Sequence, residues 1–392
     1  MSWGRAFFRT LRDLVPVSGL LFNRPIVLFQ SDDWGRVGIR DAEGFECLQA
    51  AGLGLGQRPY DFYTLETAND VSELKATLER HRDSLGRHPC LEMNFILGNL
   101  DFGKMEADSW RRIHTLPLAN GLPCGWARPG LTEAYRLGIA DGVFHPALHG
   151  MTHFCRPQVE RNLMEGGERT TLLRTLWQVG TPYIHWRMPW VGYEYWSQEN
   201  PPEERFLPKR LQQQLIGEAV GAFAKMFSML PHSACAPGYR SNEDTVRAWS
   251  QHGINVVQNG PGALVPPYFD RNEVLHLSRN VEFEPAVHGN FSLQACLRAA
   301  ENCFLQGVPA VVSIHSINFH STVRDFRSRT LQFLEGFLGT LEERYKDLMY
   351  LHSTDLYELA QTGTCKTPDG KAQVEVLMKK FRKTKPLVHT VA

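Results

Sequence analysis

The chain lacks several features that would identify a class of protein at once: it has no CxxC pair, no internal repeat, no low-complexity segment and no excess of one charge. Lys and Arg together number 42, as do Asp and Glu, so the formal net charge is zero. Because a nucleic-acid-binding protein needs a basic face, we expect no nucleic-acid partner. The balance also disfavours long-range steering of a polyanionic substrate.

Long apolar runs are missing as well. None approaches the ~20 apolar residues that a membrane-spanning helix needs. The early apolar stretch 15–22 is broken by Pro16, Ser18 and Gly19, and no clear cleavage site follows it. The eight cysteines are dispersed along the chain, a pattern more typical of free thiols than of disulfides. We therefore expect a cytoplasmic protein.

What the sequence does contain, from residue 23 onward, is an alternation of short β-rich runs with helical patterns. The 392 residues, 43% of them hydrophobic, suffice for one large core. The patterns predict strands at 26–30, 91–97, 143–148, 233–236, 254–258, 310–315 and 349–352, and helices at 71–86, 107–115, 206–230, 243–252, 292–305 and 326–346. This alternation predicts an α/β fold with a parallel sheet covered by helices. Polar motifs follow several strands, as expected of a barrel that gathers its functional groups at the carboxyl ends of its strands.

The two ends of the chain depart from this pattern. We predict an N-terminal basic amphipathic segment (1–22), a single catalytic domain (23–362) and a basic C-terminal tail (363–392). Residues 3–15 place apolar side chains at helical spacing with arginines between them. We expect a helix that closes the bottom of the barrel; the alternative is peripheral association of residues 1–15 with the inner face of the membrane. The tail is expected to be solvated.

The most informative motif is the pair of carboxylates Asp32 and Asp33, directly after the apolar run 26–29. Adjacent like charges at the edge of a core repel unless a cation lies nearby, and a metal ion is the usual one. His149 and His153 supply two imidazoles at HxxxH spacing, a pattern that also arises by chance. Two imidazoles and one carboxylate form a three-ligand set that leaves positions open for water and substrate. The set predicts a hydrolytic site for a divalent metal, with Zn2+ as the expected ion.

His315 ends another predicted strand. Opposite a hydrolytic metal it would act as a general acid, because a departing amine must be protonated. One aspartate of the pair can bind the metal, and the other can accept a proton from metal-bound water. The alternatives are structural: a helix cap or turn for Asp32 and Asp33, and a hydrogen-bonded core histidine for His315.

In order and spacing these residues resemble the motifs of the polysaccharide deacetylase superfamily, the NodB-type carbohydrate esterases of family 4 and their relatives. The likeness covers most of the predicted catalytic domain and implies a distorted (β/α)7-type barrel. It also implies a role for each motif residue. These are Asp32 as catalytic base, Asp33, His149 and His153 as metal ligands, and His315 as general acid.

The third motif of the family is only partly present. The stretch 236–239, Ala-Pro-Gly-Tyr, is similar to the family's proline-containing loop, which implies a backbone N–H near Tyr239 that holds the oxyanion. Family members commonly carry Arg before this proline, where it pairs with the base, but here the position is Ala236. Arg240 and Arg279 are the candidates to replace that arginine. Glu282 and Glu284 are the candidates for the acid that orients His315.

The resemblance implies removal of an N-acetyl group, or alternatively an O-acetyl group, from a carbohydrate or amino-sugar substrate. Aromatic residues crowd the segment 183–196, where they would contact a sugar ring, form a hydrophobic lid or make an oligomer contact. Trp34, beside the carboxylates, is expected to line the pocket, with Tyr239 and Arg240 as further substrate contacts. Three other functions stay open: amide hydrolysis of a small non-sugar metabolite, carbohydrate binding without catalysis, and a scaffold role.

Overall fold

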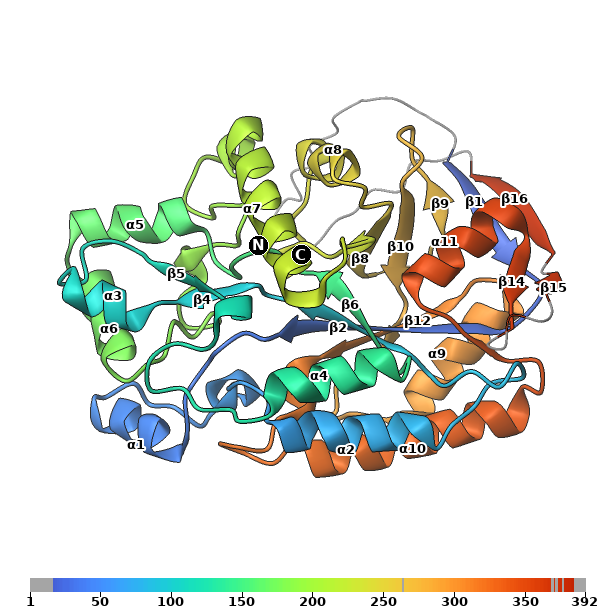
Figure 1. Ribbon diagram of the computed structural model, residues 1–392, viewed down its shortest axis with the longest axis horizontal. Coiled ribbons are helices and arrows are strands. Elements are labelled where there is room, and N and C mark those ends of the chain that lie inside the picture. Colours follow the sequence, from blue (N-terminus) through green and yellow to red (C-terminus); the bar gives the residue numbers. More distant parts are fainter. Residues whose placement is uncertain (1–16, 263, 368–369, 371–372, 376, 384–392) are drawn as a thin grey trace, which may run out of the picture.

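The computed structural model describes residues 17–262, 264–367, 370, 373–375 and 377–383 (Figure 1). At its centre, strands run parallel in the spatial order β12 (Ala310–His315), β2 (Ile26–Trp34), β3 (Leu91–Phe95), β6 (Phe144–Leu148), β7 (Ser233–Ala234), β8 (Val256–Pro261) and β10 (Leu275–Arg279). The predicted α/β class and parallel sheet are confirmed. Because all these strands point the same way, their carboxyl ends meet along one edge.

The two ends of this row of strands are joined by one continuous run of chain. Asn280 follows β10 and leads directly into β11 (Val281–Glu282), which pairs in parallel with β12. The Asn280 N–H donates to Val311 O at 3.0 Å, and the Val311 N–H donates to Asn280 Oδ1 at 2.8 Å. The sheet therefore curls round in the manner of the expected distorted barrel, and side chains from distant strands meet in its interior.

Helices flank the sheet on the outside (Figure 1). They are α1 (Ala42–Ala50), α2 (Ala68–Glu79), α3 (Phe102–Ala107), α4 (Leu131–Ala140), α5 (Arg156–Glu165), α6 (Glu168–Gln178), α7 (Lys209–Phe227), α8 (Glu243–Gln251), α9 (Leu293–Leu305), α10 (Arg327–Arg344) and α11 (Ser353–Thr362). In α7, Leu215, Ala219 and Phe223 are buried at steps of four residues, which is the apolar face that the sequence predicted.

The helix predicted over 107–115 is wrong. The helix in this region, α3, ends at Ala107, and Ser109 and Trp110 then adopt left-handed φ values of +53° and +58°. Two successive left-handed residues cannot continue a right-handed helix. The chain instead turns into β5 (Thr115–Pro117), which pairs with β4 (Gly98–Leu100).

The ends of the described chain are part of the sheet. Beyond β10 the sheet continues through β9 (Tyr268–Phe269) and β1 (Val17–Phe22) to β16 (Met378–Lys383), all in antiparallel pairs. The boundary predicted at residue 22 therefore falls at the end of the sheet strand β1, and the predicted basic tail contains the sheet strand β16. The sequence pattern missed this because the partners of the β1–β16 pair lie at opposite ends of the chain.

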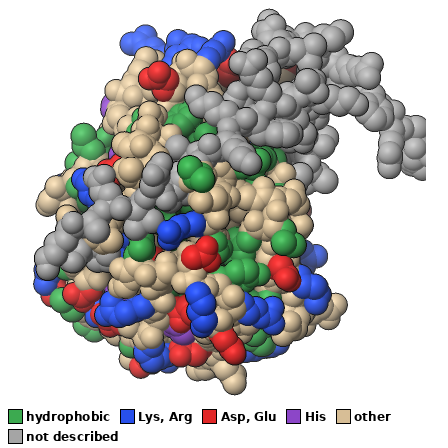
Figure 2. All heavy atoms as spheres, turned by 90° about the vertical axis from the view of Figure 1, so that its right-hand side faces the viewer, with side chains coloured by type: hydrophobic (Ala, Val, Ile, Leu, Met, Phe, Trp, Pro, Cys, Tyr) green, Lys and Arg blue, Asp and Glu red, His purple; other side chains and the backbone are tan. Residues whose placement is uncertain are grey.

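Three shorter strands complete the described chain: β13 (Met349–Tyr350) pairs with β2, and β14 (Thr364–Lys366) pairs with β15 (Gln373–Glu375). The predicted amphipathic helix over 3–15 lies outside the described residues, so membrane association through it stays a prediction. Among the described residues, no helix has the length and apolarity to cross a membrane. On the face that Figure 2 shows, acidic and basic side chains are interspersed, in keeping with the balanced composition.

Candidate metal centre

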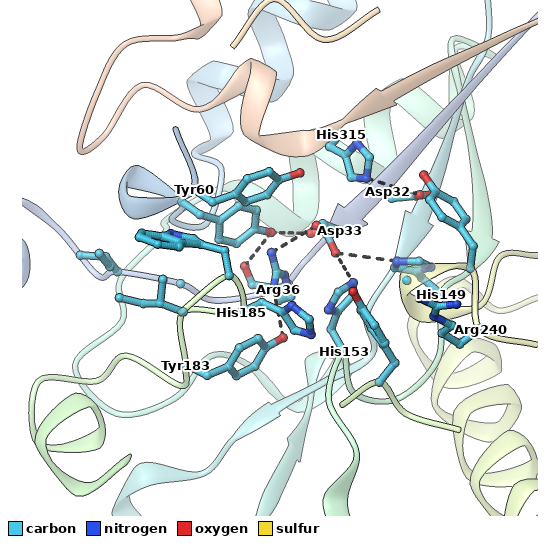
Figure 3. Close-up of a pocket in the computed structure, with 18 residues that line it drawn as sticks. Asp32, Asp33, Arg36, Tyr60, His149, His153, Tyr183, His185, Arg240 and His315 are labelled. Atoms are coloured by element: carbon cyan, nitrogen blue, oxygen red, sulfur yellow. Dashed lines mark hydrogen bonds and ion pairs between the residues drawn. The ribbon is translucent and has the colours of Figure 1, made fainter. Parts of the chain in front are cut away.

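Three of the predicted residues lie together at the carboxyl ends of β2 and β6 (Figure 3). Asp33 Oδ1 lies 3.3 Å from His153 Nε2 and 3.7 Å from His149 Nε2. Ligand atoms around a tetrahedral zinc ion lie roughly 3.4 Å apart, given bonds of ~2.0–2.1 Å, so this spacing suits one shared ion. Asp33 Oδ1 is also buried and has no hydrogen-bond partner among the described residues. The three residues therefore fit a divalent metal.

Both imidazoles are in the protonation state that binds metal. His149 Nδ1 lies 2.9 Å from the carbonyl oxygen of Cys235, which can only accept, so Nδ1 carries the proton and Nε2 keeps its lone pair. Burial lowers the pKa of His149 and holds the pKa of His153 well below its usual range. Both rings are thus neutral at neutral pH, as metal coordination requires.

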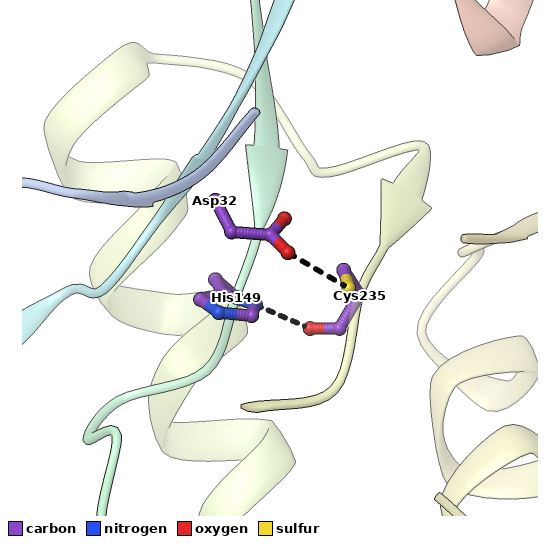
Figure 4. Close-up of side chains that lie close together, drawn as sticks. All are labelled: Asp32, His149 and Cys235. Atoms are coloured by element: carbon purple, nitrogen blue, oxygen red, sulfur yellow. Dashed lines mark hydrogen bonds between the residues drawn. The ribbon is translucent and has the colours of Figure 1, made fainter. Parts of the chain in front are cut away.

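A second group of possible ligands, Asp32, His149 and Cys235, lies beside the first (Figure 4). Burial and the neighbouring Asp32 carboxylate raise the pKa of the Cys235 thiol well above its usual range, which disfavours the thiolate that a metal needs. Both oxygens of Asp32 already accept hydrogen bonds from Arg279. The group around Asp33 is therefore the better metal site.

Asp32 is held in place by a buried arginine. Arg279, with none of its surface exposed, donates from Nη1 to Oδ2 at 2.7 Å and from Nη2 to Oδ1 at 2.6 Å. Asn94 Nδ2 donates to Oδ1 at 2.7 Å. Burial alone would raise the pKa of Asp32, but the Arg279 guanidinium holds it well below its usual range. The sequence offered two arginines as partners of Asp32, and of these Arg279 pairs with it and Arg240 does not.

His315 lies beside Asp32 because β12 and β2 pair in parallel, in a register that sets the two residues opposite each other. Its Nε2 is 3.8 Å from Asp32 Oδ2, and its Nδ1 is 2.6 Å from Glu284 Oε1. Burial would lower the pKa of His315, but the Glu284 carboxylate raises it to about 9, so the ring is protonated at neutral pH. Glu284 is therefore the acid that orients His315, whereas Glu282 pairs with His288 at 2.9 Å.

The second oxygen of Asp33 is bound by an arginine that the sequence did not single out. Arg36 Nη2 donates to Asp33 Oδ2 at 3.1 Å, and its Nη1 donates to Tyr183 Oη at 3.0 Å. The Tyr63 hydroxyl donates to the Asp33 backbone oxygen at 2.8 Å. These bonds fix the carboxylate with Oδ1 towards the histidines. The only sequence signal for Arg36 is its position three residues after Asp33, which many surface ion pairs share.

Glu194 holds the loop between the two histidines. Its Oε1 accepts from the Met151 N–H at 2.8 Å and from the Thr152 N–H at 3.2 Å. Gly150 has a φ of +94°, and a Cβ at this position would collide with the Glu194 carboxylate. Glu194 belongs to the aromatic segment 183–196. Its link to the histidine loop is a tertiary contact that no local spacing reveals.

A cavity of 410 Å³ opens at this group (Figure 3). Besides the proposed ligands, Asp32 and His315, aromatic and cationic side chains line it: Tyr60, Tyr63, Tyr183, His185, Trp186, Tyr193, Tyr239, Arg36 and Arg240. The segment 183–196 thus forms part of the cavity wall, which favours substrate contact among its three predicted roles. Tyr239 and Arg240, which were predicted to contact the substrate, are among the residues that line the cavity.

One detail of the predicted site is wrong. Trp34 does not line the cavity: it is fully buried, its ring stacks on Phe319 with centroids 5.8 Å apart, and its N–H donates to Ser31 Oγ. Asp33 has a φ of +75°, which breaks the alternation of β2 and turns the next side chain into the core. The resemblance implied a backbone N–H near Tyr239 as the oxyanion donor; the N–H of Tyr239 itself donates to Ala236 O at 2.8 Å, so the donor stays a prediction.

No protein-family model matches the chain, and no curated protein matches it in sequence. Among solved structures, the chain is similar to a protein from Parabacteroides distasonis described as a glycoside hydrolase or deacetylase; the TM-score is 0.49, the identity is 11%, and the match covers 91% of this chain and 75% of that one. It is also similar to a protein from Mycobacterium smegmatis described as a polysaccharide deacetylase, with a TM-score of 0.46, 13% identity and coverage of 89% and 95%.

A third similar structure is a CE4 family pseudoenzyme from Bacillus anthracis, with a TM-score of 0.38, 8% identity and coverage of 86% of this chain and 66% of that one. At such identities and TM-scores, these similarities assign no role to any residue of this chain.

Proposed function

We propose that this protein is a metal-dependent hydrolase that removes an N-acetyl group from an amino-sugar substrate, with zinc as the bound ion. One observation carries the proposal: Asp33, His149 and His153 converge on one point of the cavity, with Asp32 and His315 beside them. A purely structural metal site would need only Asp33, His149 and His153. A hydrolytic site also uses Asp32 and His315.

The chemistry divides between the ion and the side chains. A divalent ion held by Asp33, His149 and His153 would polarise the substrate carbonyl and lower the pKa of a water molecule. Asp32 accepts a proton from the attacking water. Its two hydrogen bonds from Arg279 keep the carboxylate ionised and oriented for that step.

His315 completes the reaction by protonating the departing nitrogen. Its raised pKa, caused by Glu284, keeps the ring protonated at neutral pH, which a general acid requires. Glu284 also accepts from the backbone N–H of His315 at 3.3 Å, so ring and backbone are held by one carboxylate. An acetate ester would be cleaved by the same groups, with an alkoxide as the leaving group.

The choice of a sugar is supported by the shape and lining of the cavity. Its 410 Å³ and its tyrosine and tryptophan rings suit a pyranose, whose apolar faces pack on aromatic rings. Tyr239 contributes its ring, which is held at the wall because Arg279 Nη1 donates to its hydroxyl at 3.0 Å.

The experiment is to measure acetate release from N-acetylated and O-acetylated sugars by the zinc-loaded protein. We expect release with the wild-type chain and none with Asp33→Ala. A matched control is His145→Ala: His145 also forms an HxxxH pair with His149, but its ring stacks on His352 with centroids 4.0 Å apart, away from the cavity. Zinc bound at the site without acetate release from any sugar would instead favour carbohydrate binding without catalysis.

A further inference from the structure

We propose that the substrate carries an anionic oxygen group, a carboxylate or a phosphate, and that Arg240 binds it. The inference rests on the proposed function in one respect, namely that the cavity is the substrate site. It adds the chemical class of the substrate, which neither the metal ligands nor the acid and base define.

Three carboxylates at the cavity each pair with a cationic side chain, whereas Arg240 pairs with none of them. Asp32 pairs with Arg279 at 2.6 Å, and Asp33 pairs with Arg36 at 3.1 Å. Glu284 pairs with His315 at 2.6 Å. Arg240 lines the same cavity, but within the described part of the chain it forms no ion pair with a carboxylate, and its buried Nε has no hydrogen-bond partner. A divalent ion at the metal site would add to this surplus of positive charge.

The position of Arg240 leaves its donors available. Its guanidinium lies over the Trp196 ring, 4.8 Å from the centroid, and Arg240 is one of the side chains that line the cavity in Figure 3. Stacking on an indole uses the face of the guanidinium and leaves the N–H groups at its edge free. A planar edge of two N–H donors matches the two oxygens of a carboxylate or phosphate.

The supporting ring is itself fixed, so Arg240 is held before the substrate arrives. Trp196 is 8% exposed, and its backbone bridges to Tyr193 and Phe206. A neutral sugar would leave the buried donor of Arg240 without a partner, which costs binding energy, whereas an anionic group would satisfy it. The zero net charge of the chain does not conflict with this, because the surplus is local and acts at hydrogen-bonding distance.

The test is calorimetric binding of four probes: N-acetylglucosamine, its 6-phosphate, the matching uronic acid, and N-acetylmuramic acid. Each is titrated into metal-free and zinc-loaded protein. We expect at least one acidic sugar to bind more tightly than the neutral one, and the Arg240→Gln variant to reduce that preference about 10- to 100-fold. The member of the set that is preferred distinguishes carboxylate from phosphate.

Arg205→Gln is the matched control, because Arg205 stacks on the same Trp196 ring at 5.5 Å but does not line the cavity. It should keep the preference for the acidic sugar. Equal or tighter binding of the neutral sugar, or a preference that survives Arg240→Gln, would overturn the inference. Binding is read without turnover, so a protein that prefers the acidic sugar but releases no acetate would contradict the proposed function and leave this inference standing.

Discussion

The contact between His315 and Glu284 gives a prediction with a defined magnitude. Glu284→Gln keeps the shape of the side chain and removes the charge that raises the pKa of His315 from its ordinary 6.5 to about 9. Without that charge the pKa falls back towards the ordinary 6.5, because burial opposes protonation and only the Asp32 and Asp33 carboxylates still favour it. A full return to 6.5 is the largest effect. At about pH 8, the fraction of protonated rings then drops from about 90% to about 3%.

Since the general acid works only when protonated, kcat/KM for deacetylation should fall by as much as about 30-fold at about pH 8 and less than twofold at about pH 6. The assay is acetate release across pH. In the wild type the protonated form is lost as the pH rises through about 9, so the alkaline limb of the profile lies there. In Glu284→Gln that limb should move to near-neutral pH.

Glu282→Gln is the matched control, because Glu282 pairs with His288 and does not contact His315. Its profile should follow the wild type. An NMR titration of the His315 ring in each variant reads the same pKa without turnover. A Glu284→Gln profile with an unmoved alkaline limb, or an unchanged His315 titration, would refute the assigned role of Glu284.

Three further changes test the rest of the site. Asp32→Asn should keep zinc and lower kcat about 10²- to 10⁴-fold, because the base is removed and the ligands are not; full turnover would show that another group takes the proton. His153→Ala should lose most of its zinc by elemental analysis, whereas His145→Ala should keep it; equal zinc content in the two would move the site elsewhere. Arg279→Leu removes the guanidinium that pairs with the buried Asp32 carboxylate, so the free energy of unfolding, measured with urea, should fall by about 3–5 kcal/mol at neutral pH. That loss should shrink in acid as Asp32 becomes protonated, and a loss below about 1 kcal/mol would contradict the pairing.

The three candidate metal ligands could be picked out because their signal is local in the sequence. Asp33 follows an apolar strand, and His149 and His153 stand four residues apart, so each motif is visible without knowledge of the rest. The parallel sheet could be predicted for a related reason: alternating strands and helices lead to it almost independently of detail. The resemblance implied the roles of Asp32 and Asp33, and the separate contacts of the two carboxylates support the proposed roles.

For the partners of Asp32 and His315 the sequence offered two candidates each and could not choose between them, because these partners come from distant parts of the chain. Arg279 lies on β10, a short strand that the sequence pattern did not reveal, and it reaches Asp32 only because the sheet curls round. Glu282 and Glu284 look alike in sequence, and the structure separates them by which histidine each contacts. The position of Trp34 was predicted wrongly, because the sequence does not reveal that Asp33 adopts a left-handed backbone conformation within the strand.

The central claim is that one divalent ion is shared by Asp33, His149 and His153, and a crystal structure of the zinc-loaded protein tests it most directly. We predict an anomalous zinc peak bonded to Asp33 Oδ1 and His149 Nε2, and to a ring nitrogen of His153, at ~2.0–2.2 Å. Zinc bound instead by Asp32, His149 and Cys235, or three side chains too far apart to share an ion, would contradict it.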